Sequence, residues 1–150
     1  MVSILVVTHY SLGAAYCEIV RHFFGQQMPS DFVITACCED SQPDLLEKVK
    51  NALDKAPENR PALLLTDVLG STPCNMLQQL ESTRPVTIIA GLNVPMLVKA
   101  LQDAQKYESA TLLAREVVHR AKQGIVSFDL SYSYEAVSYT HLRAHETRED

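Results

Sequence analysis

The sequence predicts an α/β protein whose parallel sheet is covered by helices on both faces. Four short apolar runs, rich in β-branched residues, alternate with stretches that place apolar residues at helical spacing. Continuous runs of this kind are typical of strands buried on both faces, and their alternation with helices predicts parallel strands joined by helical crossovers. The short strands fit a doubly wound, flavodoxin-like sheet of strand order 2-1-3-4 better than a long Rossmann sheet.

The predicted elements follow one another without a repeat or a linker. Strands are predicted at residues 2–8, 32–38, 62–66 and 86–90, where the apolar runs lie. Helices are predicted at residues 12–24, from the capping box of Ser41 and Asp44 up to Pro57, from about Pro73, from about Val94, and at 109–123. The apolar residues 125–130 then predict a fifth strand.

Composition excludes several classes of protein. The 150 residues suit one domain, with 47% apolar and 21% charged residues, and the net charge of -5 disfavours nucleic acid as a partner. The N-terminus lacks the basic region of a signal peptide, and the apolar runs are too short to cross a membrane. We therefore expect a cytoplasmic protein that does not insert into the membrane.

Neither a metal nor a cofactor is expected from the motifs. The four cysteines form no CxxC pair, and we expect reduced, buried thiols at Cys17, Cys37, Cys38 and Cys74. The glycine-rich fingerprints of nucleotide-binding proteins do not follow the first predicted strand.

The carboxyl ends of the first and third predicted strands carry the candidate chemistry. Ligands bind at these ends of a doubly wound sheet, beside the switch point in strand order. The first run leads to His9, and Asp67 follows the third. Because neighbouring strands lie about 4.8 Å apart, the carboxylate can accept a hydrogen bond from one ring nitrogen and leave the other nitrogen's lone pair free. This pairing predicts a nucleophilic histidine; the alternative is a surface histidine beside an aspartate that caps a loop.

Residues suited to an anion follow the predicted aspartate. Gly70 permits a tight turn, and Ser71 and Thr72 offer amides and hydroxyls at the start of a helix. Since helix N-termini attract anions, these residues predict a site for a phosphoryl group beside the histidine. Asn93 indicates a second helix start nearby and is a further candidate to bind the phosphoryl group, with simple capping as the alternative role.

Three motifs together resemble a known family. They are VVTHYSLG, LLLTDVLGSTPCN and IIAGLNVPMLVKAL, in this order and spacing. The sequence resembles, over roughly residues 1–128, the EIIA domain of the mannose-type bacterial phosphotransferase system. The resemblance implies a phosphotransferase component that carries a phosphoryl group on His9, with Asp67 as the orienting carboxylate and Thr72 helping to hold the phosphoryl group. It also implies transfer from the phosphocarrier HPr to an EIIB domain, and a homodimer made by a C-terminal antiparallel strand.

Other classes of protein share some of these motifs. The chain could be a stand-alone regulatory module, or the EIIA-like phosphodonor subunit of dihydroxyacetone kinase, although the TPCN and NVPML motifs fit the mannose type better. A response-regulator receiver would use Asp67 as its phosphoacceptor. Such a receiver needs acidic residues after the first strand to hold Mg²⁺, where this chain has His9. The sequence does not indicate which sugar is transported, since sugar specificity would lie in a membrane partner.

Some residues depart from the pattern. Tyr10 stands where the family usually has glycine, and a positive φ at this position would strain a tyrosine. Its large ring beside the entrance to the site would slow phosphoryl transfer or alter the choice of partner. His22 and His119 lie in predicted helices without a paired carboxylate, and we expect structural roles for both.

The C-terminal residues do not continue the domain. The expected domain covers residues 1–130, and residues 131–136 are of uncertain status. Residues 137–150 resemble a translated sequencing-adaptor string, so this tail is excluded from the site together with His141 and His145.

Overall fold

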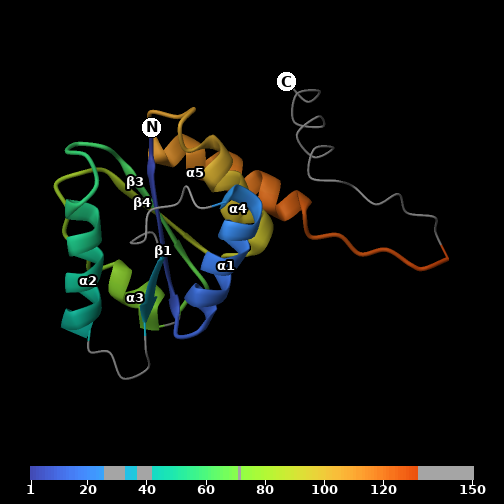
Figure 1. The fold of residues 1–150 in the computed structure, drawn as a ribbon, viewed down its shortest axis with the longest axis horizontal. Coiled ribbons are helices and arrows are strands. Elements are labelled where there is room, and N and C mark those ends of the chain that lie inside the picture. The colour runs from blue at the N-terminus through green and yellow to red at the C-terminus, as the bar shows by residue number, and fades with distance from the viewer. Residues whose placement is uncertain (26–32, 37–41, 71, 132–150) are drawn as a thin grey trace.

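A computed structural model of the chain describes residues 1–25, 33–36, 42–70 and 72–131. Its centre is a parallel sheet of strand order β2-β1-β3-β4 (Figure 1). The strands are β1 (Ser3–His9), β2 (Val33–Ala36), β3 (Ala62–Thr66) and β4 (Val86–Ala90). The α/β architecture with a parallel sheet is the one that the sequence predicts, and the strands lie in the expected order.

Helices form a layer on each face of this sheet (Figure 1). One layer consists of α1 (Leu12–Phe24), α4 (Val94–Asp103) and α5 (Ala110–Gln123), and the other of α2 (Gln42–Asp54) and α3 (Thr72–Leu77). The crossovers between parallel strands require this arrangement, since each helix must bury its apolar stripe against the sheet.

Alternate residues of the central strands supply two separate cores. In β3, Leu63 and Leu65 pack with α1, α4 and α5, whereas Leu64 packs with α2 and α3. All three side chains are fully buried. Successive side chains of a strand point to opposite faces, so a strand covered on both faces must be apolar at every position. This is why the strand reads as an uninterrupted ALLLT run.

The register of the sheet positions the ends of β1 and β3. Val7 pairs with Thr66, the last residue of β3, so β1 runs two residues further, to His9. On its other side His9 pairs with Ala36 of β2. The chain leaves β3 at Asp67, directly beside this extension of β1. Backbone register alone therefore brings the histidine and the aspartate to one edge of the sheet.

Side chains cap two of the helices where the sequence indicates helix starts. The Asn93 side chain accepts a hydrogen bond from the Met96 amide, 2.9 Å away, at the start of α4. The Ser109 hydroxyl does the same for the Leu112 amide at the start of α5. These bonds satisfy amides that have no partner within the helix. The predicted capping box at Ser41 lies outside the described residues.

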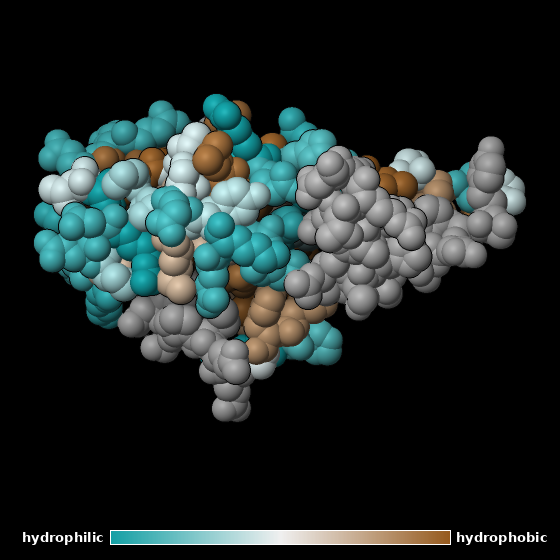
Figure 2. All heavy atoms as spheres, turned by 90° about the horizontal axis from the view of Figure 1, so that it is seen from above, coloured by the Kyte–Doolittle hydropathy of each residue, from teal (hydrophilic) through white to brown (hydrophobic). Residues whose placement is uncertain are grey.

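The segment after α5 differs from the prediction of a fifth strand. Residues 125–131 form no strand in the described chain and lead away from the sheet (Figure 1). Four large apolar side chains of this segment are exposed: Ile125, Val126, Phe128 and Leu130. Brown, apolar atoms are visible along the projecting segment in Figure 2. A strand exists through hydrogen bonds to a neighbouring strand, and the strand pairs of the described residues do not include this segment.

Among the described residues, no helix combines the length and the apolar character that a membrane span requires.

Candidate functional site

The imidazole of His9 and the carboxylate of Asp67 meet at the carboxyl edge of the sheet. Nδ1 of His9 lies 2.6 Å from Oδ2 of Asp67, and the backbone N–H of His9 donates to the same oxygen over 3.0 Å. The second carboxylate oxygen accepts from the Val68 amide at 2.9 Å. The His9 side chain is 50% exposed and the Asp67 side chain only 6%. One end of the pair is thus anchored in the protein, while the other faces solvent.

The surroundings of Asp67 keep its carboxylate ionised. Burial by itself would raise the pKa of this group, but the hydrogen bonds from His9 and Val68 and the charge interaction with His9 outweigh burial and lower the pKa below its ordinary value. An ionised carboxylate only accepts hydrogen bonds, so Nδ1 of His9 must carry the hydrogen. In a neutral imidazole this leaves Nε2 with its lone pair free, on the exposed side of the pair.

In the turn between β1 and α1, the backbone is strained at Ser11 and not at Tyr10, the residue that the sequence indicated. Tyr10 has no positive φ, whereas the next residue, Ser11, has φ of 69° and ψ of -34°. Ser11 precedes α1, and its side chain makes no capping hydrogen bond. A positive φ is costly for a residue with a Cβ, so the strain expected at Tyr10 falls on Ser11 instead. Tyr10 is 69% exposed beside the histidine.

The loop from β3 to α3 contains the predicted phosphoryl-binding residues. Gly70 has φ of 84°, a left-handed conformation that glycine adopts without strain, and its carbonyl accepts a hydrogen bond from the Asn75 side chain at 3.2 Å. Helix α3 begins at Thr72, close to the predicted start. The residue Ser71 and the side chain of Thr72 lie outside the described part of the chain.

The loop from β4 to α4 is fastened to the end of β3. The Gly91 amide donates to the Asp67 carbonyl at 2.9 Å, and the Leu92 amide donates to the Thr66 carbonyl at 3.0 Å. Asn93 follows, with its side-chain oxygen engaged in capping α4. The structure therefore shows the capping role that the sequence left as the alternative for Asn93, and it brings this loop next to Asp67.

Tyr16 of α1 is a neighbour of the site that the sequence did not single out. Its side chain is buried and its hydroxyl donates to the Leu92 carbonyl at 3.1 Å. Burial, followed by the negative charge of Asp67, raises the pKa of this phenol, which therefore stays protonated. The sequence signal for this contact is a tyrosine on the predicted apolar face of a helix, because a buried Tyr hydroxyl usually has a hydrogen-bond partner.

Four large, exposed apolar side chains lie within three residues of His9 or Asp67 in the chain. They are Tyr10, Leu12 at the start of α1, Val68 and Leu69, with exposures from 38% to 77%. We call these four residues the apolar rim. Exposed apolar residues gathered around a reactive group are typical of a surface that a protein partner covers.

The remaining sequence candidates lie apart from the site. His22 is exposed and packs edge-on against Phe23, and His119 is exposed next to Gln123. Cys74 is a buried free thiol, as expected, while Cys17 is only half-buried. Cys37 and Cys38 lie outside the described residues. Within the described ranges, no group of three or more histidine, cysteine, aspartate or glutamate side chains could hold a metal ion.

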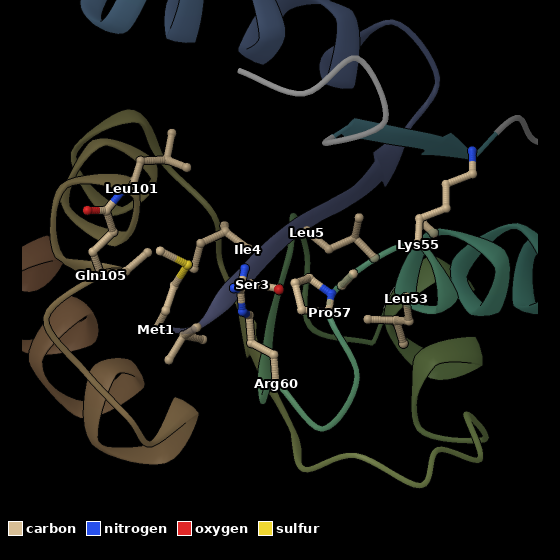
Figure 3. Close-up of a pocket in the computed structure, with 14 residues that line it drawn as sticks. Met1, Ser3, Ile4, Leu5, Leu53, Lys55, Pro57, Arg60, Leu101 and Gln105 are labelled. Carbon is tan, nitrogen blue, oxygen red and sulfur yellow. The ribbon is translucent and has the colours of Figure 1, made fainter. Parts of the chain in front are cut away.

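A cavity of about 400 Å³ lies at the opposite, amino-terminal edge of the sheet. Figure 3 shows it between the first residues of β1 and the ends of α2 and α4, with Arg60 beside Ser3. Apolar side chains such as Leu5, Leu53 and Leu101 form much of its wall. It holds no pair comparable to His9 and Asp67, and ligands of doubly wound sheets bind at the other edge. The His9 edge is therefore the candidate functional site.

The chain matches a known family over most of its length. Residues 3–117 match the family model EIIA-man, described as the PTS system fructose IIA component, where PTS is the phosphotransferase system. The chain belongs to this family. The match covers both His9 and Asp67. PTS IIA components are phosphocarriers in sugar uptake and generally work with HPr and EIIB partners, so this EIIA-man chain is a component of phosphoryl transfer.

Solved structures share the fold of this EIIA-man chain. The phosphotransferase system component EIIA from Streptococcus agalactiae has a TM-score of 0.73 and 26% identity, covering 85% of this chain and 98% of its own. The mannose/sorbose specific IIA subunit from Enterococcus faecalis has a TM-score of 0.74 and 23% identity, with coverage of 86% and 96%. A third, the PTS IIA protein associated with the fucose utilization operon of Streptococcus pneumoniae, has a TM-score of 0.65 and 24% identity, with coverage of 85% and 96%. The last two names give different sugars and the first gives none, so no sugar is assigned to this chain.

Proposed function

We propose that this EIIA-man chain carries a phosphoryl group on Nε2 of His9, received from phosphorylated HPr and passed to an EIIB domain. The observation that carries the proposal is the 2.6 Å contact between Nδ1 of His9 and Oδ2 of Asp67. It directs the hydrogen of a neutral imidazole to Nδ1 and the lone pair to Nε2. The half-exposed ring presents that lone pair to a partner.

The transfer step needs only the two imidazoles. The Nε2 lone pair of His9 attacks the phosphorus of the phosphohistidine on HPr, a new N–P bond forms, and the N–P bond of the donor breaks with its electrons returning to the donor nitrogen. The imidazolium character that develops on His9 is stabilised by the Asp67 carboxylate, in the way that an aspartate supports a catalytic histidine. In the transfer to EIIB, a nucleophile of EIIB attacks the phosphorus, and the N–P bond to His9 breaks with its electrons returning to Nε2.

The β3–α3 loop is the proposed cradle for the phosphoryl oxygens. Gly70 turns the chain at this point, and we assign the amides and hydroxyls of Ser71 and Thr72 to the phosphoryl group, because the start of a helix favours negative charge. Asn93 acts indirectly, by capping α4 and holding its loop beside Asp67. Donors fixed in advance need little reorganisation when the charge arrives.

The apolar rim is the proposed docking surface for both carriers. Phosphoryl transfer between two proteins competes with hydrolysis, and a partner seated on Tyr10, Leu12, Val68 and Leu69 would exclude water from His9. Tyr10 stands in place of the glycine usual in the family, and its exposed ring would supply a contact that a glycine cannot make. We expect it to influence which carrier docks.

The assembly and the extent of the working unit are part of the proposal. We infer that the phosphocarrier unit covers residues 1–130 and works in the cytoplasm. We also infer a homodimer in which residues 125–130 pair with the edge of a partner's sheet. The exposed apolar side chains of this segment support the inference. The tail at 137–150 lies outside the described residues, and we assign it no role.

Labelling with phosphorylated HPr tests the function. Incubation with enzyme I, HPr and ³²P-phosphoenolpyruvate is expected to label the chain with an acid-labile, base-stable bond on His9. The variant His9→Ala is expected to lose the label, while His22→Ala, a matched change of an exposed histidine, is expected to retain it.

Two outcomes would overturn the assignment. Label that persists in His9→Ala would place the phosphoryl group elsewhere. A base-labile bond would indicate an acyl phosphate and would move the chemistry to Asp67. Transfer onward to a purified EIIB domain would distinguish a carrier from a purely regulatory module, which would be labelled but would not discharge.

A further inference from the structure

Tyr16 ties three chain segments of the site together. It comes from α1, which begins three residues after His9, and its hydroxyl donates to the Leu92 carbonyl in the β4–α4 loop. The same loop donates from Gly91 to the Asp67 carbonyl and from Leu92 to the Thr66 carbonyl. The buried phenol thus links the helix that follows His9 with the loop that holds the backbone of Asp67.

We propose that Tyr16 is a positioning residue for phosphoryl transfer, which acts through the β4–α4 loop to hold Asp67 in place against Nδ1 of His9. The inference rests on the proposed function of His9 and adds to it a residue that touches neither the reacting atoms nor the partner. Its ring is 8% exposed, so it has no surface to offer to a carrier.

The loop needs such an anchor because its backbone conformation is special. Gly91 has φ of 92°, a left-handed conformation, and nothing lies within 4 Å of the place where a Cβ would stand. Side-chain packing at Gly91 therefore does not hold the loop. The loop is held by the Leu92 side chain, which is buried in the core, and by hydrogen bonds to Thr66 and Asp67 on one side and from Tyr16 on the other.

The electrostatic surroundings agree with this role. The pKa of the Tyr16 phenol is raised by burial and then by the negative charge of Asp67, which places the phenol within the field of that carboxylate. Both Tyr16 and Asp67 are buried, and the interaction between Asp67 and His9 is stronger where the local dielectric is low. Loss of the hydroxyl would release the Leu92 carbonyl and let the loop move.

The test is the variant Tyr16→Phe, which keeps the ring and removes the hydroxyl. In steady-state transfer from phosphorylated HPr through this chain to an EIIB domain, we expect kcat to fall about tenfold with KM unchanged, because a small displacement of a catalytic group is costly while the docking surface is intact. In ¹⁵N spectra of the unphosphorylated protein, we expect the His9 ring to lose its uniform Nδ1–H form and show a mixture of the two tautomers.

Two further variants separate positioning from simple stability. Tyr107→Phe removes a phenol hydroxyl beyond the end of α4, at the opposite edge of the sheet, and is expected to leave kcat and the His9 spectrum as in the wild type. Gly91→Ala strains the same loop from its backbone and is expected to reproduce the effect of Tyr16→Phe. The double variant is expected to fall short of the product of the two single effects, because both loosen one element.

The proposal is wrong if Tyr16→Phe and Tyr107→Phe lower the melting temperature alike and both leave kcat and the His9 tautomer unchanged. Its failure is distinguishable from failure of the proposed function. If the wild type accepts no phosphoryl group on His9, the carrier role is wrong, and the ¹⁵N spectrum still reports whether Tyr16 orients the pair.

Discussion

Thr66 places an unsatisfied hydroxyl group in the core directly before the site. Its side chain is fully buried, and its Oγ1 has no hydrogen-bond partner among the residues that the structure describes. A buried hydroxyl without a partner costs about 1–3 kcal/mol. We expect Thr66→Val, which keeps the shape, to raise the free energy of unfolding by about 1 kcal/mol in urea titrations. A decrease would show that a water molecule or the phosphorylated state uses this hydroxyl.

Asp67 makes stability depend on pH in a defined direction. Its pKa in the folded chain is below the ordinary value of 3.8, so the folded state favours the ionised form. This contribution is fully present above that ordinary value and is lost as pH falls from there through the folded pKa, because the unfolded state then binds the proton more readily. We expect the free energy of unfolding to decrease below about pH 4, and to decrease less in Asp67→Asn.

The measurement is a series of urea titrations between about pH 2 and pH 6 on the wild type, Asp67→Asn and Asp54→Asn. Asp54 lies at the exposed end of α2 and serves as the control. Equal acid sensitivity of the wild type and Asp67→Asn would mean that the contacts with His9 and Val68 do not stabilise the carboxylate.

At the scale of an element, α4 depends on its cap. Asn93 has an extended backbone and accepts a hydrogen bond from the Met96 amide, with Pro95 in the first turn. We expect Asn93→Ala to lower the free energy of unfolding by about 1 kcal/mol, and Asn93→Ser to restore most of it, because a serine hydroxyl can cap as well. Thermal unfolding followed by circular dichroism is the measurement.

The same pair of variants decides whether Asn93 also binds the phosphoryl group. If it acts only as a cap, Asn93→Ser is expected to transfer phosphoryl groups at the wild-type rate. Slow transfer in a stable Asn93→Ser protein would show a direct contact of the amide with the phosphoryl oxygens, the ligand role that the sequence predicts for this residue.

At the scale of the whole molecule, the segment after α5 and the edge strand of the sheet favour association with a second chain. In the described sheet β4 lies at the edge, and four large apolar side chains of residues 125–130 are exposed. An uncovered sheet edge is a template for pairing with another strand. We expect light scattering of the full chain at micromolar concentration to show a dimer, and Val126→Pro to shift it to a monomer, since proline removes an N–H and cannot join the ladder.

The matched control for the dimer is Val126→Thr. Threonine keeps the N–H and the β-branched shape, so we expect it to remain dimeric. Dimers that persist in Val126→Pro would show that the chains associate through another surface, and the role of residues 125–130 would then be withdrawn.

The sequence by itself determined the elements and their order, because these depend on local patterns. The uninterrupted apolar run at 62–66 could only be a strand covered on both faces, and helical spacing of apolar residues predicted α1 with the bounds that the structure shows. His9 at the end of the first strand and Asp67 after the third were found in the same way. A parallel sheet brings the ends of its strands to one edge, so the pairing followed from topology without any knowledge of side chains.

Tertiary structure alone decided how the site is held together, since the deciding contacts join residues far apart in the chain. Besides the predicted contact with the His9 ring, Asp67 accepts a bond from the backbone N–H of this residue 58 positions away, and the Tyr16 hydroxyl donates to a carbonyl 76 positions away. Neither bond leaves a local pattern to read. The strain fell on Ser11, because the turn from β1 into α1 is set by how the helix packs on the sheet. The predicted fifth strand is absent from the single chain for the same reason: strand structure depends on a neighbour, and a sequence pattern does not say where that neighbour comes from.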